Sequence, residues 1–243
     1  MKRPTVRIGC AGWTLPGVHR ALFPGEGTHL QRYAGVFDCV EINSSFYRPH
    51  RPRTYRTWAA SVPAGFRFSV KMPKAISHVA RLRHCDSMLE QFLAQAEQLG
   101  DKLGFLLLQL PPSLAYDARS ALRFFEHLRA RHAGAIGCEP RHPSWFTDDV
   151  EDALRERRIA RVAADPAIVP SAAMPGGDRS CEYLRLHGSP RMYYDAYPQA
   201  ILDRMAQSLL RPSSEVVERW CIFDNTARGN ATTDALALLR ETR

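Results

Sequence analysis

The sequence of 243 residues predicts an α/β fold of the TIM (β/α)8 barrel type, formed by a single domain over residues 1–243. Three observations support this prediction. Eight short apolar runs cross the chain, segments with helical periodicity separate them, and nearly every run ends in polar residues. Alternating strands and helices favour parallel pairing, and a parallel barrel gathers its functional residues at the carboxyl ends of its strands.

The eight predicted strands follow one another at intervals that suit a barrel. Their ends lie 23 to 39 residues apart, so each interval can hold one helix and one strand, as a parallel crossover requires. Eight such units equal the number that closure needs. The strands are predicted at residues 6–9, 39–42, 66–70, 105–108, 136–138, 162–164, 183–186 and 221–223.

The segments between these strands have helical periodicity, with one exception. Asp86 is placed to cap one helix, and Gly100 follows the end of that helix. The exception is the interval 166–179, where three prolines and a pair of glycines predict an irregular connection between strands six and seven. An open doubly wound sheet is the alternative fold, although no G-x-G-x-x-G turn follows any strand. Helices are predicted over residues 30–37, 54–61, 86–99, 117–128, 148–157, 202–210 and 232–239.

The formal net charge of +8 favours anionic partners, such as phosphorylated metabolites or nucleic acid. Much of this charge comes from arginines within the predicted helices, where such residues usually form solvated faces. No apolar run of about 18 residues occurs, so we expect no contact with a membrane through a spanning helix. The sequence does not indicate an oligomeric state.

The cysteines and the first residues of the chain predict a cytoplasmic protein. None of the six cysteines belongs to a Cys-x-x-Cys pair, so neither a zinc ribbon nor a redox dithiol is expected. Most of them lie in or beside predicted strands, where cysteine packs as a small apolar residue in its reduced form. The first residues lead directly into a strand and do not form a signal peptide.

Four carboxylates and one imidazole fall in or directly after predicted strands, at Glu41, Glu139, Asp165, Asp224 and His187. In a barrel these side chains converge on one mouth. There they can act as an acid–base pair, bind a divalent metal ion, or form ion pairs with neighbouring lysines and arginines. No His-Glu-x-x-His spacing indicates a metal, so a divalent cation stays one alternative. No nicotinamide or flavin turn is seen, so neither cofactor is expected.

Further reactive residues lie at the ends of two other strands. Lys71 can form a Schiff base if burial lowers its pKa, or it can pair with a carboxylate or a phosphate. Arg141 has a planar guanidinium that suits an anion, and His142 titrates near neutral pH. Trp145 can stack on a ring or complete the core, and the tyrosines and arginines nearby can line a pocket or contact a nucleotide.

At these positions the chain resembles the YecE-like family, domain of unknown function 72. The resemblance implies a TIM-barrel fold and no settled activity. Two positions depart from the family pattern: Ser77 replaces a threonine before His78, and Asp224 stands where the first of two asparagines is common. The matching segments are residues 8–13, 40–47, 68–71, 77–78, 139–145, 183–188 and 223–226, and they span nearly the whole chain.

From these residues we expect an enzyme of the hydrolase or isomerase type that acts on a small anionic sugar-like or nucleotide-like substrate. The residues predicted to be catalytic are Glu41, Lys71, Glu139 and His187. Those predicted to bind the substrate are Trp13, Asn43, Tyr47, Arg141, His142, Trp145, Arg185, Asp224 and Asn225. Two alternatives are a protein that binds or processes nucleic acid and a non-catalytic barrel that binds a ligand or a protein.

Overall fold

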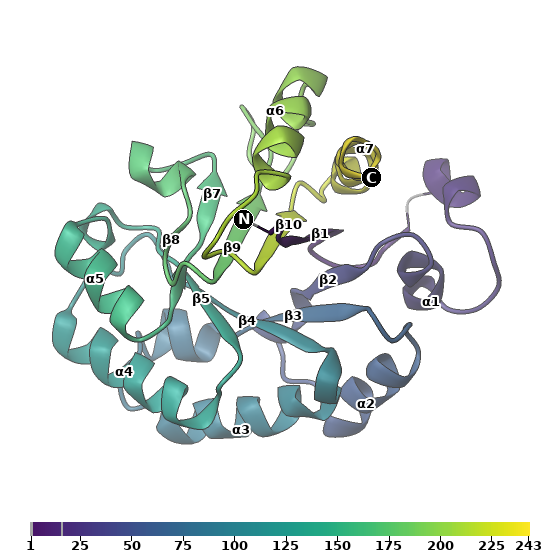
Figure 1. Ribbon diagram of the computed structural model, residues 1–243. Coiled ribbons are helices and arrows are strands. Elements are labelled where there is room, and N and C mark those ends of the chain that lie inside the picture. Colours follow the sequence, from purple (N-terminus) through teal and green to yellow (C-terminus); the bar gives the residue numbers. More distant parts are fainter. Residues whose placement is uncertain (1, 16) are drawn as a thin grey trace.

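The computed structural model describes residues 2–15 and 17–243 and has an α/β architecture in which parallel strands are surrounded by helices (Figure 1). The strands form two sheets. The first has the order β1-β10-β9-β7, and the second has the order β2-β3-β4-β5-β6-β8. All neighbouring strands pair in parallel except β6 and β8, which are antiparallel.

The strand bounds agree with the apolar runs, with two exceptions near the middle of the chain. The sixth predicted strand is divided at Val162 into β6 (Ala160–Arg161) and β7 (Ala163–Asp165), and the connection after it contains the two-residue β8 (Gly176–Gly177). The other strands are β1 (Thr5–Cys10), β2 (Cys39–Ile42), β3 (Arg67–Lys71), β4 (Leu103–Gln109), β5 (Ala135–Glu139), β9 (Cys181–Leu186) and β10 (Glu218–Phe223).

The two sheets meet at both of their margins. At one margin β6 pairs with β5 of the second sheet, while β7, one residue further along, pairs with β9 of the first sheet. At the other margin Ala11, directly after β1, forms an isolated parallel bridge with Glu41 in β2. Among the described residues this bridge does not extend into a ladder, so the expected barrel is present as two adjoining parallel sheets.

The helices lie outside the strands (Figure 1). The α-helices are α1 (His29–Ala34), α2 (Pro52–Ala60), α3 (Asp86–Ala96), α4 (Ala118–Arg131), α5 (Asp148–Glu156), α6 (Gln199–Leu209) and α7 (Asn230–Thr242). Helices α1, α3 and α5 are shorter than the predicted segments, whereas α2, α4, α6 and α7 are longer. In α3 the last predicted turn is instead a 3-10 helix, η4 (Glu97–Lys102), that kinks at Gly100. Within the described residues no helix is long and apolar enough to cross a membrane.

Short helical turns follow several strands and hold their polar ends. These turns are η1 (Gly17–Leu22), η2 (Ser44–Phe46), the π-helical η3 (Ala75–Val79), η5 (Pro143–Trp145) and η6 (Pro170–Ala173). The prediction that Asp86 caps α3 is wrong: Cys85 occupies the N-cap, and Asp86 lies inside the helix. Its carboxylate instead accepts a hydrogen bond of 2.6 Å from Arg123 on the neighbouring helix α4.

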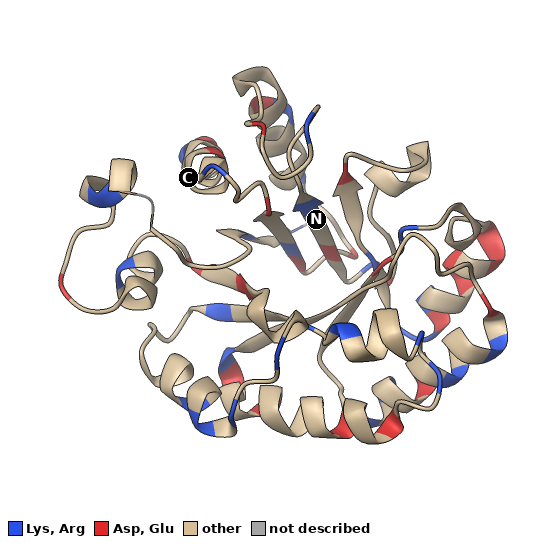
Figure 2. Ribbon diagram, turned by 180° about the vertical axis from the view of Figure 1, so that it is seen from behind, with Lys and Arg blue, Asp and Glu red and all other residues tan. Residues whose placement is uncertain are grey.

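The positive charge of the helices is largely balanced where it lies. Figure 2 shows basic and acidic residues interspersed along the outer helices. Arg131 pairs with Glu90 at 2.8 Å, and Arg157 pairs with Glu126 at 2.8 Å. These are exposed ion pairs that contribute little to stability. They support the interpretation of these arginines as a solvated surface.

A small apolar cluster between the two sheets receives side chains from both of them. Its aromatic members are Phe105 on β4, Tyr183 on β9 and Trp220 on β10, all of them fully buried. The rings of Tyr183 and Trp220 stack with centroids 5.8 Å apart, and Phe105 lies 4.3 Å from Tyr183. All six cysteines are buried and free, as predicted. The apolar cluster forms a floor below the polar residues that follow along the same strands.

Candidate functional site

The polar centre of the molecule is a consequence of strand periodicity. Successive side chains of a strand point to opposite faces, so Tyr183, Arg185 and His187 all project from β9 and its end toward the interior. Tyr183 belongs to the apolar floor, whereas Arg185 and His187 face acids from other strands. The sequence places each of these residues in its strand, but only the fold brings the acids of distant strands to them.

Arg185 lies at the centre of this arrangement and is fully buried. Its Nε and Nη2 donate to Oε2 and Oε1 of Glu41, over 3.0 and 2.7 Å. Its Nη1 donates to Oε2 of Glu139 over 2.7 Å, and Nη2 also donates to Oδ2 of Asp224 over 2.9 Å. The single guanidinium therefore pairs with three carboxylates that come from three different strand ends.

A second layer of hydrogen bonds supports Glu41. The hydroxyl of Tyr183 lies 3.0 Å from Oε2 of Glu41 and 2.9 Å from the hydroxyl of Ser69 on β3. Burial and the charge of Glu41 hold the pKa of Tyr183 well above its ordinary value, so this hydroxyl keeps its proton and can donate it. Glu41 is therefore fixed from two sides and has no freedom to turn.

His187 lies between the other two acids. Its Nε2 is 3.1 Å from Oε1 of Glu139, and its Nδ1 is 3.1 Å from Oδ2 of Asp224, although the second contact is not aligned as a hydrogen bond. Arg141 contacts both Nε2 of His187 and Oε1 of Glu139. If Nε2 accepts from Arg141, the ring proton sits on Nδ1 and faces Asp224; if Nε2 donates, Glu139 receives the proton.

Two acids of this cluster, Glu139 and Asp224, have a lowered pKa. Burial raises the pKa of Glu139, but the charges of Arg185 and Arg141 outweigh that effect and hold the pKa well below its ordinary value. The pKa of Asp224 is also lowered, because Arg185 and His187 outweigh the effect of burial. Burial by itself lowers the pKa of Arg185, but the three carboxylates outweigh burial and hold the pKa well above its ordinary value. This guanidinium therefore stays charged. The expected pair with one protonated carboxyl therefore does not form between Glu139 and Asp224.

Lys71 is the cation of the cluster that is not tied to an acid. Its side chain is 5% exposed, and within the described residues no carboxylate oxygen lies within ion-pair distance of Nζ. Nζ instead lies 4.3 Å from the centre of the Phe46 ring. Burial, helped by the nearby charge of Arg185, lowers the pKa of Lys71 to about 8. A useful fraction of this amine is neutral, and therefore able to accept a proton or attack a carbonyl, near physiological pH.

A metal ion would need carboxylate oxygens that are free to bind it. In this cluster the carboxylates instead accept hydrogen bonds from the guanidinium of Arg185. Among the described residues, no group of three or more His, Cys, Asp or Glu side chains is arranged to hold a metal ion. The ion-pair interpretation of the acids fits this geometry, with Arg185 and Arg141 as the cations.

The remaining predicted residues divide between the rim and the core. Trp13 packs edge-on against Trp58 with ring centroids 5.0 Å apart, and Tyr47 is 68% exposed beside Phe46. Asn43 is half-buried, and its Oδ1 accepts no hydrogen bond from a described residue. His142 binds Ser144 through Nδ1, at 2.9 Å from the hydroxyl, and so stabilises the turn η5.

Two residues predicted to bind substrate have structural contacts instead. Trp145 is buried in the core and donates its indole N–H to the carbonyl of Leu114 over 2.9 Å. Asn225 is fully buried and donates to Asp234 over 2.7 Å and to the carbonyl of Asp195 over 2.9 Å. Asp165, a candidate carboxylate, lies outside the cluster and accepts from the hydroxyl of Tyr197 over 2.8 Å.

Sequence reasoning missed the supporting residues of the cluster. Ser69 and Tyr183 each lie two positions before a candidate residue of the same strand, Lys71 and Arg185. A period of two therefore placed them on the same face, and this signal was available. The contact of Phe46 with Lys71 depends on the turn η2 that follows β2, which the strand pattern does not indicate.

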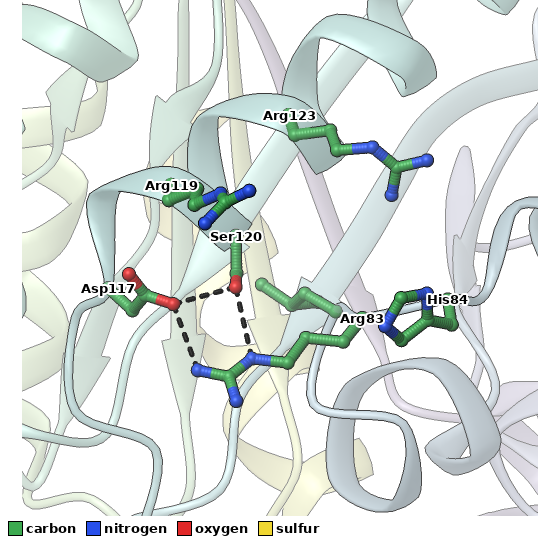
Figure 3. A pocket seen from close by; sticks show the side chains of 7 residues that line it. Arg83, His84, Asp117, Arg119, Ser120 and Arg123 are labelled. Carbon is green, nitrogen blue, oxygen red and sulfur yellow. Dashed lines mark hydrogen bonds and ion pairs between the residues drawn. The ribbon is translucent and has the colours of Figure 1, made fainter.

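A cavity of about 430 Å³ lies at the ends of β1 and β10, and its lining residues do not include those of the cluster. Two of its lining residues are close to cluster residues: Ala11 forms the isolated bridge with Glu41, and Thr226 follows Asp224 by two residues in the chain. Arg228 and the hydroxyls of Thr14 and Thr232 add polar groups to the same wall. A larger cavity, of about 770 Å³, lies apart from the cluster between the loop before α3 and the start of α4 (Figure 3).

Comparison with known proteins agrees with the sequence motifs. The family described as "Protein of unknown function DUF72" matches residues 7–243. The UPF0759 protein YecE of Escherichia coli K12 is 34% identical over 173 residues, which cover 69% of this chain and 61% of that protein. The chain thus spans about three fifths of the length of that relative. The UPF0759 protein YunF of Bacillus subtilis is 26% identical, over 96% of this chain and 93% of that protein.

Solved structures of the same family share the fold. A DUF72 family protein from Enterococcus faecalis superposes with a TM-score of 0.81 at 20% identity, over 98% of this chain and 95% of that one. A DUF72 family protein from Thermotoga maritima superposes with a TM-score of 0.79 at 23% identity, over 97% of this chain and 98% of that one. The chain belongs to the family of proteins of unknown function DUF72.

Proposed function

We propose that this protein is an enzyme that transfers a proton to or from a small anionic substrate, with Lys71 as the reacting base. The observation that supports this most directly is the position of Lys71. Its buried amine lies beside an ion-paired cluster yet has no carboxylate partner within 4.0 Å among the described residues. A lysine of purely structural role would be expected to pair with one of the three acids near it.

The surrounding residues have distinct roles in this proposal. Glu41, Glu139 and Asp224 hold Arg185 through hydrogen bonds and set the electric field around the amine. His187 is the second proton carrier, because its ring contacts both Glu139 and Asp224. Arg141 pairs with Glu139, but its buried Nε has no hydrogen-bond partner among the described residues, so this N–H is the donor left for an entering carboxylate or phosphate. These groups suit an isomerase-type reaction best. In such a reaction Lys71 and His187 move a proton between two atoms of one substrate, and no further reactant is needed.

The substrate would enter through the cavity of about 430 Å³ at the ends of β1 and β10. That volume suits a sugar-like or nucleotide-like compound. Arg228 and the threonine hydroxyls on its wall can bind an anionic group, while the reacting end of the substrate reaches past Asp224 to Lys71.

We also propose that the two sheets form one closed (β/α)8 barrel in solution. Three observations support closure: the bridge between Ala11 and Glu41, the direct continuation of β6 into β7, and the shared apolar floor. Nuclear Overhauser contacts between the backbones of residues 11 and 41 would test it. Closure is contradicted if those contacts are missing while contacts between β1 and β10 are present.

The proposed activity is tested with the variant Lys71→Met, which removes the amine but keeps an unbranched buried side chain. Thermal unfolding is measured with sugar phosphates, nucleotides and small carboxylates, since a ligand at about 100 times its Kd stabilises by roughly 2.7 kcal/mol. For a compound that stabilises the protein, exchange of its carbon-bound hydrogens with D2O is then followed. The wild type should exchange and Lys71→Met should bind without exchange. Equal exchange by both proteins would contradict the role of Lys71.

A second candidate function is binding of single-stranded nucleic acid on the rim. Arg191 lies 3.9 Å and Arg228 lies 5.6 Å from the centre of the exposed Tyr194 ring, so a base could stack where two cations meet a phosphate. Binding of a labelled oligonucleotide should then weaken steeply with salt and be lost in Tyr194→Ala. Binding that does not respond to salt would remove this candidate.

A further inference from the structure

We infer that the cavity between the loop before α3 and the start of α4 binds the phosphate group of a nucleotide-sized ligand. The cavity has a volume of about 770 Å³, which is within the range of small-molecule sites. None of its lining residues belongs to the Arg185 cluster, so this site is independent of the proposed catalytic centre. Figure 3 shows the side chains that line it.

The lining has an excess of cations that are suited to phosphate. It contains three arginines and one histidine, but only one carboxylate, that of Asp117. The Asp117 carboxylate already accepts hydrogen bonds from Ser120 over 2.6 Å and from Arg83 over 2.9 Å, which lowers its pKa. It is thus held against one wall (Figure 3). Planar guanidinium groups bind phosphate oxygens through paired hydrogen bonds.

Arg119 is the residue best placed to bind the ligand. Arg83 is held by Asp117, and Arg123 is held by Asp86 at 2.6 Å. The side chain of Arg119 forms no ion pair or hydrogen bond with any other residue that the structure describes, and no dashed line reaches its guanidinium in Figure 3. The first turn of α4 forms the same wall, so the positive end of a 14-residue helix dipole adds to the potential.

The loop before α3, which carries Arg83 and His84, has an unusual backbone conformation. Arg81, Leu82 and His84 have φ values of 52°, 65° and 49°, a left-handed conformation that non-glycine residues rarely adopt. The Leu82 side chain is buried, and Arg81 donates to the carbonyl and the hydroxyl of Ser113 across the gap, over 2.8 and 3.1 Å. These contacts hold Arg83 and His84 in place, which reduces the entropy lost on binding.

The test measures binding of three probes by calorimetry at low and at physiological salt: pyrophosphate, ADP and a single-stranded oligouridylate. The variant is Arg119→Gln. The matched control is Arg131→Gln, which removes the same charge from the other end of the same helix. We expect Arg119→Gln to weaken binding by about tenfold or more, as loss of one charge-assisted hydrogen bond implies, and Arg131→Gln to change it by less than about twofold.

The probes also separate the sources of the phosphate. Binding of ADP or pyrophosphate that depends on Arg119 assigns the site to a free phosphorylated compound, and binding of the oligouridylate alone assigns it to a nucleic-acid backbone. Asp117→Asn should tighten binding, because it removes the negative charge of the lining and releases Arg83. The inference is overturned if none of the probes binds, or if Arg131→Gln weakens binding as much as Arg119→Gln does. Since Lys71→Met leaves this cavity unchanged, its behaviour in the exchange assay is independent of this result.

Discussion

Arg185 donates a hydrogen bond to each carboxylate oxygen of Glu41, with Nε 3.0 Å from Oε2 and Nη2 2.7 Å from Oε1. The two side chains come from β9 and β2, which belong to different sheets. The contact therefore joins the two sheets through their interior, and only an arginine has the planar pair of donors that fits it.

Removing Arg185 should destabilise the fold severely. In Arg185→Leu three buried carboxylates lose their common partner, and we expect a loss of about 3–5 kcal/mol in the free energy of unfolding. Denaturant unfolding followed by circular dichroism measures it. The control is Arg155→Gln, which breaks an exposed pair with Asp152 and should cost less than about 1 kcal/mol. A loss in Arg185→Leu as small as in the control would show that the cluster is not a stabilising centre.

The stability of the fold should decline in acid because of Glu139 and Asp224. Both groups have a lowered pKa in the folded protein, against ordinary values of 4.5 and 3.8. The stability that they confer is complete above those ordinary values and is lost as the pH falls through the lower, folded values. Unfolding free energies measured from pH 6 downward should therefore decrease, and Glu139→Gln should show a shallower decrease. An identical slope in both proteins would contradict the pairing.

Lys71 should reduce the stability of the fold at neutral pH. Its pKa falls from 10.5 to about 8 on folding, so the charged form is disfavoured in the folded state. The cost is complete below pH 8 and disappears as the pH rises toward 10.5. At pH 7 the variant Lys71→Met should be more stable than the wild type by up to about 3 kcal/mol. The gain should be smaller at pH 10, and a variant that is less stable than the wild type at both values would contradict the desolvation of this amine.

Two tyrosines offer a matched test of the hydrogen bonds that support Glu41. Tyr183→Phe keeps the stacked ring but removes the hydroxyl that contacts Glu41 and Ser69, and should cost about 1–3 kcal/mol. Tyr55→Phe removes a buried hydroxyl that has no partner among the described residues, and should cost little or even stabilise the protein. Chemical denaturation of both variants gives the comparison. Equal costs would mean that the Tyr183 hydroxyl adds nothing to the support of Glu41.

Much of the strand order was predictable, because buried parallel strands leave short apolar runs that end in polar residues. Glu41, Lys71, Glu139 and His187 were identified in this way, and the structure brings them together. Periodicity could not show that Arg185 would pair with acids of three strands, because pairing depends on the stagger between strands that are far apart in sequence. The burial of Asn225 was missed for a related reason, since its partner Asp234 lies in another segment, whereas the core position of Trp145 was one of the two alternatives that the sequence left open.

The middle of the chain was predicted least accurately. Prolines and glycines correctly indicated an irregular connection after strand six, but two-residue elements such as β8 are too short to leave a pattern. The sequence also could not predict the division of strand six at Val162. This division depends on the neighbouring strands, because Ala160 pairs with β5 and Ala163 pairs with β9.

That division has a consequence for how the molecule unfolds. One stretch of six residues, from Ala160 to Asp165, supplies a strand to each sheet. Unfolding of this stretch in one sheet therefore disrupts the strand pairing of the other sheet. The two sheets should therefore melt together in one cooperative transition, with coincident curves from fluorescence and circular dichroism. A chain cut within this stretch should yield two halves that are each unfolded alone and that regain structure only when mixed.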